Sequence, residues 1–461
     1  MKANITFKRT LMSSRRLSVL SSVLFGTFFS LPLFGQLQNV VINTQDTLAC
    51  RVRTAQVEKV TVAPGGTSVS LTTVAGETVD FPADEFMNLE VRQAMAPIVN
   101  YRHNVENPYV QRFVHHTVYD TLDYSYSVVE DFIDLKKRRD FPNPLVFRLR
   151  PVANGVEPMT PYPGGCSLQI SRSDDFSKSP LLPMPGDSAV VYDLTPGDTV
   201  RYRIVSNATG VRLQQGVAAI EGQVRMIYLE SVDNVRDIGG WPVLGGGHIR
   251  YGMLYRGSKL HTAGTTFISD DDVQRMRDLG IRAEFDLRGR TEANNAEAQY
   301  AYSRLGKDVS YDIVNAGCIA YMAIFDKPAT IALEWRKMYY RFKQGVPLFY
   351  HCSRGCDRVG TLTLLIEGVL GVSENDLCLD YELSSFCGKD GLRHRNERYL
   401  HPDYDFEAVM RTIKSYPGET LRDKFEYYLV RVCGVSASEI EAFRKGMIVP
   451  DVHWRPERPK R

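Results

Sequence analysis

The first third of the chain alternates short apolar and polar segments, separated by glycine and proline. Residues 57–62 and 68–74 are rich in β-branched side chains, and a Pro-Gly-Gly run at 64–66 divides them. Because successive side chains of a strand point to opposite faces of a sheet, this pattern predicts strands. We expect residues 36–144 to form a β-rich N-terminal region and linker, less regular towards its end.

The alternation is most regular between residues 145 and 228, where Pro- and Gly-containing turns separate the expected strands. These strands are predicted at 146–150, 167–171, 189–192, 200–205 and 224–228. The segment 192–205 resembles the closing strands of a fibronectin type III or related sandwich. This resemblance implies an immunoglobulin-like β-sandwich over residues 145–228, and a sandwich by itself indicates no ligand.

Helical and strand patterns alternate after about residue 230. The sequence predicts helices over 269–279, 328–342 and 361–370, with glycine shortly after each, at 280, 345 and 371. It predicts strands over 281–287 and 346–350. Glycine just beyond a periodic apolar segment is a common helix end. The alternation indicates an α/β domain in which helices flank a central sheet.

A basic and then apolar segment opens the chain. Lys and Arg residues within the first 16 positions precede an apolar run over 17–34, which Pro32 interrupts. This order is typical of a secretory signal peptide, predicted at residues 1–35, whereas a membrane anchor would need about 20 apolar residues. The chain is therefore expected to be exported to the periplasm, the cell surface or the medium, without a stable membrane span after cleavage.

Composition adds few constraints. The 461 residues are enough for two or three domains, and a net charge of +2 with 43% hydrophobic residues indicates neither disorder nor nucleic-acid binding. The basic residues at 136–139 are interpreted as a solvated surface, and residues 449–461 as a basic tail. Export would allow disulfides among six of the cysteines, whose pairing the sequence does not give: Cys50, Cys166, Cys318, Cys378, Cys387 and Cys433.

One segment carries recognisable chemistry. Cys352 and Arg358 lie six positions apart, with Gly355 between them, after an apolar strand and before an apolar helix. In such a loop, backbone N–H groups at a helix N-terminus can hold an anion, and the positive potential there favours a thiolate. The planar guanidinium of Arg358 can grip two phosphoryl oxygens. The arrangement suits attack of a thiolate on a phosphate monoester.

This segment resembles the protein tyrosine phosphatase superfamily at His351, Cys352, Gly355, Asp357, Arg358 and Gly360. The H-C-x-x-G-x-D-R pattern is most similar to the bacterial tyrosine phosphatases that have a Lys-Asp-Arg phosphate loop. Further landmarks follow the family order at 234–241, 254–260, 286–292, 380–384 and 418–447. The resemblance covers about 230–448 and implies a tyrosine-phosphatase-like catalytic domain over residues 229–448.

The resemblance also implies roles for individual residues. Cys352 would be the nucleophile, Arg358 the phosphate clamp and Asp357 the general acid, with Asp326 and Asp312 as alternative acids. No metal and no cofactor are implied. The rest of the loop would bind the substrate's phosphate, through Ser353, Arg354, Gly355, Cys356, Val359 and Gly360. Three residues outside the loop are expected in structural ion pairs, namely Arg256, Arg288 and Asp237.

Two loop positions depart from the family pattern. Cys356 replaces the family's lysine, and Val359 replaces the hydroxyl residue that helps to stabilise the leaving thiolate. Slow turnover is one expected consequence, which Thr361 could partly offset. Cys356 could also trap Cys352 in a reversible disulfide, since both thiols lie in one loop. The alternative is that Cys356 simply fills its position.

The leading hypothesis is an exported phosphatase that hydrolyses phosphate monoesters on proteins or small molecules through a cysteinyl-phosphate intermediate. Phosphotyrosine is the first candidate substrate, with dual-specificity and phosphoinositide substrates as alternatives. A second hypothesis is a weakly active or inactive surface or periplasmic protein that binds phosphorylated ligands. A Cys-His hydrolase is less favoured, because His351 on an extended strand next to Cys352 would point to the opposite face.

Overall fold

The computed structural model describes residues 38–44, 48–53, 57–63, 67–73, 76–83, 86–93, 96, 98–116, 138–149, 164–208, 210, 212–262, 265–266, 268–289, 302–313, 320–387 and 406–450. The chain divides into two compact units. One comprises residues up to 102 with 146–191 and 199–219, and the other comprises 103–145, 192–198 and 220–461. This division differs from the predicted boundaries at 144–145 and 228–229. The predicted signal peptide and nearly all of the basic tail lie outside the described residues.

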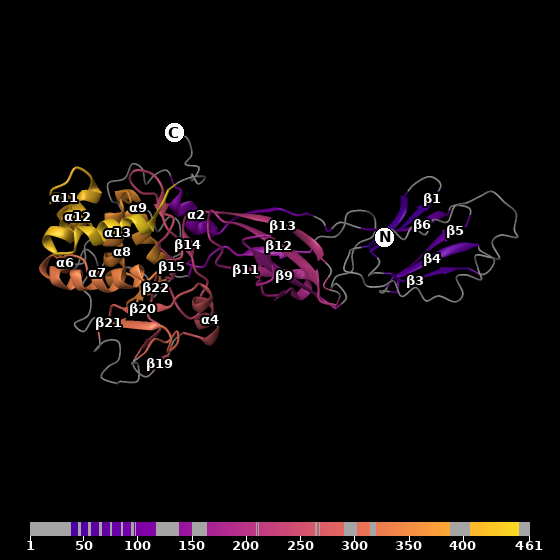
Figure 1. The fold of residues 1–461 in the computed structure, drawn as a ribbon, viewed down its shortest axis with the longest axis horizontal. Helices are drawn as coiled ribbons and strands as arrows, with labels where there is room; N and C mark the ends of the chain where they lie inside the picture. Colours follow the sequence, from indigo (N-terminus) through magenta and orange to yellow (C-terminus); the bar gives the residue numbers. More distant parts are fainter. Residues whose placement is uncertain are drawn as a thin grey trace. The chain divides into compact units, whose positions relative to one another are not determined.

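Two three-stranded antiparallel sheets form the N-terminal part of the first unit (Figure 1). One has the order β2-β1-β6, with β1 Gln38–Thr44, β2 Leu48–Arg53 and β6 Phe86–Gln93. The other has the order β3-β4-β5, with β3 Val57–Val62, β4 Ser68–Thr73 and β5 Thr78–Pro82. Strands β3 and β4 occupy the two segments that the β-branched pattern predicts, which confirms a β-rich start to the chain.

A five-stranded sheet of order β10-β9-β12-β13-β7 and a two-stranded pair β11-β8 follow. The aromatic rings of Tyr101, Phe147 and Tyr202 contact one another, with centroids 4.7 to 5.5 Å apart. The four strands predicted between 146 and 205 are present, and the fibronectin-like sandwich stays a prediction. The bounds are β7 Tyr101–Asn104, β8 Leu145–Arg148, β9 Cys166–Ser171, β10 Leu182–Pro183, β11 Ser188–Val191, β12 Thr199–Ser206 and β13 Arg212–Glu221, with a 3-10 turn at Pro185–Asp187.

A six-stranded mixed sheet organises the C-terminal unit, in the order β14-β15-β17-β22-β20-β21. Strands β17, β22, β20 and β21 are parallel, whereas β14 and β15 join antiparallel. The bounds are β14 Arg225–Met226, β15 Arg236–Asp237, β17 Leu254–Gly257, β20 Ala283–Asp286, β21 Ser310–Ile313 and β22 Leu348–His351. Two short antiparallel pairs complete the described strands: β16 His248–Ile249 pairs with β23 Ile448–Val449, and β18 His261–Thr262 pairs with β19 Thr265–Thr266.

Helices pack on both faces of this sheet, as the sequence predicts. Leu348 and Tyr350 of β22 point into the larger core, whereas Phe349 between them points into a smaller core with Met276 of α4 Asp270–Asp278. The larger core is built with α2 Pro108–Val114, α6 Ala323–Asp326, α7 Pro328–Lys343, α8 Asp357–Leu370, α9 Glu374–Glu382, α11 Phe406–Ser415, α12 Leu421–Tyr427 and α13 Ala437–Met447. A 3-10 segment at Leu383–Cys387 and a π-helical turn at Tyr428–Val432 extend α9 and α12.

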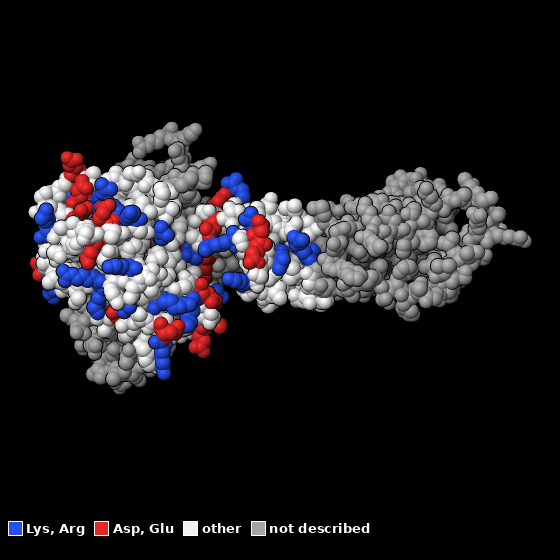
Figure 2. All heavy atoms as spheres, viewed as in Figure 1, with Lys and Arg blue, Asp and Glu red and all other residues white. Residues whose placement is uncertain are grey.

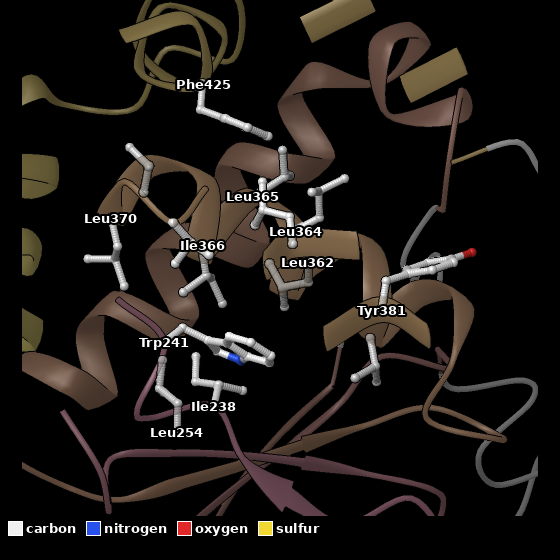
Figure 3. Packing of buried hydrophobic residues seen from close by; sticks show 14 of the residues in the cluster. Ile238, Trp241, Leu254, Leu362, Leu364, Leu365, Ile366, Leu370, Tyr381 and Phe425 are labelled. Atoms are coloured by element: carbon white, nitrogen blue, oxygen red, sulfur yellow. The ribbon is translucent and has the colours of Figure 1, made fainter. Parts of the chain in front are cut away.

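Helix α8 is buried on nearly all sides. Its leucine and isoleucine side chains pack against Trp241 and Leu254 on one side and Phe425 on another (Figure 3). A helix that is apolar all round is stable only inside a core. Gly371, at φ +97°, ends the helix where the sequence predicts, but the helix begins at Asp357, earlier than the predicted residue 361. The first turn of α8 therefore includes the residues that follow the loop.

Lysine and arginine side chains are interspersed with aspartate and glutamate on the face of the molecule drawn in Figure 2. This distribution agrees with the small net charge of +2. In the part of the chain that the structure describes, every helix is too short or too polar to cross a membrane.

Candidate active site

The loop from Cys352 to Cys356 joins strand β22 to the first turn of α8. Strand β22 lies between β17 and β20 and is parallel to both, so its carboxyl end opens at the edge where α/β proteins bind ligands. Gly355 is needed for the turn, since its φ is +70° and a Cβ would lie 2.6 Å from the carbonyl carbon and oxygen of Gly257. Cys352, 2% exposed, thus sits between a strand end and a helix N-terminus.

Two side chains hold the carbonyl groups of this loop. Asn234 Nδ2 donates to the carbonyl oxygens of Arg354 and Gly355, at 3.2 and 3.0 Å. Arg256 Nη2 also donates to the Gly355 oxygen, at 3.0 Å. Because a trans peptide is planar with its C=O and N–H in opposite directions, the N–H groups of Gly355 and Cys356 point away from these donors. The loop therefore presents N–H groups on its other side, which is the arrangement that binds an anion.

Asp380 balances the positive charge behind the loop. Arg236 donates to both of its carboxylate oxygens, at 2.9 and 3.1 Å, and Arg256 Nη1 lies 2.6 Å from Oδ2. All three side chains are at most 2% exposed. Burial alone would raise the pKa of Asp380, but the two guanidinium groups outweigh burial and lower it. Arg256 therefore has the structural ion pair that the sequence analysis predicts.

The other two expected ion pairs are also present. Asp237 Oδ2 lies 3.0 Å from Arg225 Nη1, and Asp286 Oδ2 lies 2.7 Å from Arg288 Nη2. Burial would raise the pKa of Asp286, but His351 and Arg288 outweigh burial and hold it at about 2. Both pairs are buried and belong to the scaffold of the sheet.

His351, the residue before the candidate nucleophile, is bound to a neighbouring strand. Its Nε2 lies 2.8 Å from Glu284 Oε1 on β20, and its ring is fully buried. This position agrees with the expectation that His351 points away from Cys352 and is no base for it. Its contact with Glu284 instead links the end of β22, where the loop starts, to the neighbouring strand β20.

Asn234 is fixed by a second set of contacts. It adopts the left-handed conformation, with φ +59°, which asparagine tolerates better than most residues. Its N–H donates to Asp140 Oδ2 at 2.7 Å, and its Oδ1 accepts from Arg236 Nη1 at 2.6 Å. Asp140 therefore holds the backbone of Asn234 and Arg236 holds its side-chain oxygen, so that the Nδ2 group points at the loop.

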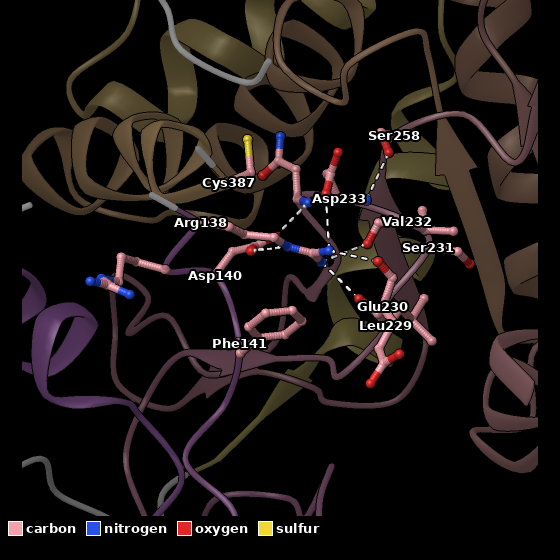
Figure 4. A network of polar contacts seen from close by, with 12 residues as sticks. Arg138, Asp140, Phe141, Leu229, Glu230, Ser231, Val232, Asp233, Ser258 and Cys387 are labelled. Carbon is pink, nitrogen blue, oxygen red and sulfur yellow. Dashed lines mark hydrogen bonds and ion pairs between the residues drawn. The ribbon is translucent and has the colours of Figure 1, made fainter. Parts of the chain in front are cut away.

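Asp140 is in turn held by Arg138, whose Nε donates to Oδ1 at 2.6 Å (Figure 4). The Arg138 guanidinium also lies 3.0 Å from Asp233 Oδ1 and donates to the backbone carbonyls of Leu229, Glu230 and Val232. Its side chain is 19% exposed. The interpretation of residues 136–139 as a solvated surface is therefore wrong for Arg138, because the aspartates and carbonyls around it replace water.

The three candidate acids have different surroundings. Asp357 is the first residue of α8, and its Oδ1 accepts a hydrogen bond from the Tyr321 hydroxyl at 2.5 Å. Asp326 is exposed at the end of α6. Asp312, on the edge strand β21, accepts from Arg341 Nε at 2.8 Å. Of the three, Asp357 alone directly follows the loop, and its role as the acid stays a prediction.

The other residues of the loop and of the first turn of α8 differ in exposure and in their contacts. Arg358 is half-buried, with Nη2 3.5 Å from Ser353 Oγ, and Arg354 is exposed. Val359 points into the core and is fully buried. Thr361 Oγ1 donates to the carbonyl oxygen of Asp357 at 2.9 Å. Because a hydroxyl has one proton, Thr361 cannot at the same time donate to a leaving thiolate.

The thiol of Cys356 contacts groups behind the loop. Its Sγ lies 3.4 Å from the Arg354 carbonyl oxygen and 3.6 Å from Asn234 Nδ2. A hydrogen bond with Cys356, together with burial, raises the pKa of Cys387. Cys387 is thus a second candidate partner beside Cys352, and the Cys352–Cys356 disulfide stays a prediction. None of the six cysteines that the structure describes forms a disulfide.

Several residues at this site had no role expected from the sequence, among them Asp140, Asn234 as a donor to the loop, and Tyr321. Asn234 begins one of the family landmarks, so a signal for its importance exists. No local pattern marks Asp140 or Tyr321, because each reaches the site through the fold. Among the described residues, no group of three or more His, Cys, Asp or Glu side chains is placed to hold a metal ion.

Residues 227–449 match the sequence model described as the tyrosine phosphatase family. A candidate tyrosine-protein phosphatase of Cupriavidus necator is 26% identical over 181 residues, which are 36% of this chain and 64% of that protein's length. This chain therefore spans less than two thirds of that relative. The matched range lies close to the predicted range 229–448, and the match supports a tyrosine-phosphatase-like hydrolase.

Two solved structures are similar in part. The core catalytic domain of the PP-IP phosphatase SIW14 from S. cerevisiae is 16% identical, covers 38% of this chain and 93% of its own, and has a TM-score of 0.23. TpbA from P. aeruginosa is 14% identical, covers 33% and 84%, and has a TM-score of 0.22. At these TM-scores the two structures add nothing to the assignment.

Proposed function

We propose that this chain, whose residues 227–449 form a tyrosine-phosphatase-like domain, is an exported phosphatase that hydrolyses phosphate monoesters through a cysteinyl-phosphate intermediate. The loop is the observation that supports this most directly. Cys352 and Arg358 stand on either side of N–H groups whose direction is set by Asn234 and Arg256. A phosphoryl group bound there would meet a nucleophile, a cation and N–H donors together.

In the first step, the Cys352 thiolate attacks phosphorus, so that the S–P bond forms and the ester P–O bond breaks. Asp357, as a carboxylic acid, gives its proton to the departing oxygen, and the alcohol leaves neutral. In the second step, water attacks phosphorus while the Asp357 carboxylate takes a proton from it. The S–P bond then breaks and returns the thiolate. Arg358 offsets charge on the equatorial oxygens in both steps.

The second step is expected to limit turnover. Val359 offers no hydroxyl to the thiolate as it leaves, and the Thr361 hydroxyl donates to the carbonyl of Asp357 instead. The same observation favours the alternative function, a surface or periplasmic protein that binds phosphorylated ligands with little or no turnover. The two functions differ in whether an alcohol product is released.

Phosphotyrosine is the substrate class that we infer first, because the relative from Cupriavidus necator is named for tyrosine-protein phosphatase activity. Dual-specificity and phosphoinositide substrates are the alternatives. Highly anionic inositol phosphates would favour several basic side chains around the loop. Here Arg354 supplies one exposed cation, whereas Cys356 is uncharged and buried.

Hydrolysis of a phosphotyrosyl peptide and of a small aryl phosphate by the reduced protein, beside Cys352→Ser, tests the proposal. We expect vanadate-sensitive release of the alcohol, absent from Cys352→Ser, with a rapid first equivalent followed by slower turnover. Vanadate or phosphate binding by folded, reduced protein that releases no alcohol would overturn the enzyme and support the phospho-ligand binder. A phosphoinositide in place of the peptide tests the substrate class.

The exported location rests on the predicted signal peptide, and the all-β part is proposed as a fibronectin-like module that presents the phosphatase domain. Cell fractionation with N-terminal sequencing of the mature protein tests the first point. A mature chain that begins near residue 36 outside the cytoplasm is expected. A chain that keeps its first residues and stays in the cytoplasm would contradict export.

A further inference from the structure

Two tyrosine hydroxyl groups meet at the proposed acid. The Tyr321 hydroxyl donates to Asp357 Oδ1 at 2.5 Å, and its oxygen lies 2.6 Å from that of Tyr381. Both tyrosines are 3% exposed. Tyr321 precedes α6 and Tyr381 belongs to α9, so two distant segments converge on the first turn of α8. Figure 3 shows the Tyr381 hydroxyl pointing away from the leucine side chains of α8.

The direction of the hydrogen bonds follows from the protons available. A hydroxyl group has one proton, and an ionised carboxylate only accepts. Since Tyr321 gives its proton to Asp357, the bond between the two phenols must be donated by Tyr381. The order is therefore from Tyr381 to Tyr321 to Asp357, and charge on the carboxylate strengthens the bond next to it.

Tyr321 is fixed to the same helical turn by its backbone. Its N–H donates to Thr361 Oγ1 at 3.0 Å, and Thr361 Oγ1 donates to the Asp357 carbonyl at 2.9 Å. Its φ is +53°, a conformation that is uncommon for a bulky residue and persists when surrounding contacts impose it. The phenol is thus held at a defined position against the Asp357 carboxyl group.

We propose that Tyr321 is a positioning residue for proton transfer: it holds one oxygen of Asp357, so that the other faces the leaving group, and Tyr381 orients Tyr321. This inference rests on the proposed function and names a further residue for its acid–base step. The phenols keep their own protons throughout. When Asp357 has protonated the departing oxygen, the carboxylate that remains still accepts from Tyr321, in the geometry needed to take a proton from water.

The effect of losing this positioning on the reaction rate would depend on the leaving group. A phenol of high pKa leaves poorly as an anion and needs the proton from Asp357, whereas a dinitrophenol leaves readily without it. A defect in positioning therefore slows phenyl phosphate more than dinitrophenyl phosphate. A defect in folding or in phosphate binding slows both equally.

The test is kcat/KM of the full-length protein for a series of aryl phosphates from phenyl to dinitrophenyl. Wild type is expected to show little dependence on the leaving group. For Tyr321→Phe, kcat/KM on phenyl phosphate is expected to fall about tenfold, a fraction of what a general acid contributes, with dinitrophenyl phosphate within about twofold. Tyr381→Phe should change the dependence in the same direction and by less. Asp357→Asn should give the steepest dependence.

Tyr202→Phe is the matched control, because its buried hydroxyl donates to the carbonyl of Val99 at 2.7 Å, and both residues belong to the other compact unit. It should leave the leaving-group dependence unchanged. No turnover by wild type would refute the proposed function itself. Suppose that wild type turns over and that kcat/KM of Asp357→Asn depends steeply on the leaving group. If Tyr321→Phe and Tyr381→Phe then both keep the wild-type dependence, the positioning role alone is overturned. If kcat/KM of Asp357→Asn depends as little on the leaving group as that of wild type, the positioning role is overturned too, since Asp357 would not be the acid.

Discussion

Arg256 donates a hydrogen bond from Nη2 to the carbonyl oxygen of Gly355, 3.0 Å away and 99 positions later in the chain. The other terminal nitrogen of the same guanidinium, Nη1, lies 2.6 Å from Asp380 Oδ2. One planar side chain therefore connects the backbone of the loop to a buried carboxylate. The contact depends on two nitrogens at a fixed separation, which a single ammonium group does not have.

Arg256→Lys is expected to weaken vanadate inhibition by about tenfold, or about 1.4 kcal/mol, because lysine can neutralise Asp380 or hold the loop but not both. The inhibition constant for vanadate measures this. Arg277→Lys is the control, since Arg277 also contacts a carboxylate, Asp308, through two nitrogens but at the surface. A change of about twofold or less is expected there. Equal effects at both positions would contradict a specific role for Arg256.

Gly355→Ala is expected to abolish vanadate inhibition and to destabilise the protein more than Gly345→Ala. Both glycines have φ +70°, but a Cβ at Gly345 meets no atom within 4 Å, whereas one at Gly355 lies 2.6 Å from the backbone of Gly257. The conformation alone costs about 1–2 kcal/mol, so Gly345→Ala measures that part. Urea unfolding and vanadate inhibition of both variants check the prediction. Normal inhibition in Gly355→Ala would show that the loop can adopt another turn.

Asp193→Asn is expected to change how stability depends on pH. Burial raises the pKa of Asp193 from an ordinary value near 3.8 to about 6 in the folded protein. The folded state therefore binds this proton more tightly than the unfolded state does. The contribution of Asp193 to the free energy of unfolding is complete below about pH 4 and is lost as the pH rises through 6. Two pKa units correspond to a loss on the order of 3 kcal/mol. Asparagine suits the φ of +62° and can still accept from the Tyr228 N–H.

Urea unfolding at pH 4 and pH 7, followed by tryptophan fluorescence, measures this difference, since Trp241 and Trp335 lie in the core of the C-terminal unit. The loss of stability between the two pH values should be smaller in Asp193→Asn than in wild type. Asp278→Asn, which changes an exposed carboxylate on α4, should keep the wild-type difference. An unchanged difference in Asp193→Asn would mean that Asp193 is ionised in both states.

Mild oxidation with diamide is expected to join Cys356 to Cys387, because the Cys356 thiol is near enough to contribute, together with burial, to the raised pKa of Cys387. Trypsin separates the candidates, since cleavage after Arg354 and Arg358 places Cys352 and Cys356 on different peptides. Mass spectrometry should find peptide 355–358 linked to peptide 359–389, with fragmentation placing the bond at Cys387 and not Cys378. A link to the peptide that contains Cys352 would instead support the trapped-nucleophile hypothesis.

The sequence predicts α4, α7 and α8 and strands β20 and β22 because the signals for these elements are local. The apolar run at 361–370 and Gly371 mark the end of α8, and Ser269 marks the start of α4, where its side chain accepts from the Asp272 N–H. The long strand β13 has a weaker signal, since Gln214, Gln215 and Gly216 interrupt its alternation. Local periodicity therefore locates elements but not their partners.

The site is predictable to the extent that it lies within one segment. Cys352, Asp357 and Arg358 are neighbours in the chain, and their spacing suffices to propose the chemistry. Arg138 and Tyr321 reach the site only through folding, and nothing in a run of basic residues distinguishes one that is buried among carbonyls from one in water. Contacts between residues about 100 positions apart, such as Arg138 to Val232, require the three-dimensional arrangement.

The anchoring of the loop carbonyls by Asn234 and Arg256 has a consequence for selectivity. Folding sets the direction of the N–H groups, so the loop need not rearrange when an anion binds. It should accept any tetrahedral oxyanion of suitable size, with little preference for the group that the phosphate carries. Discrimination between a phosphorylated protein and a phosphorylated small molecule must therefore reside in the surface around the loop, where variation would change the choice of ester without disturbing the reaction.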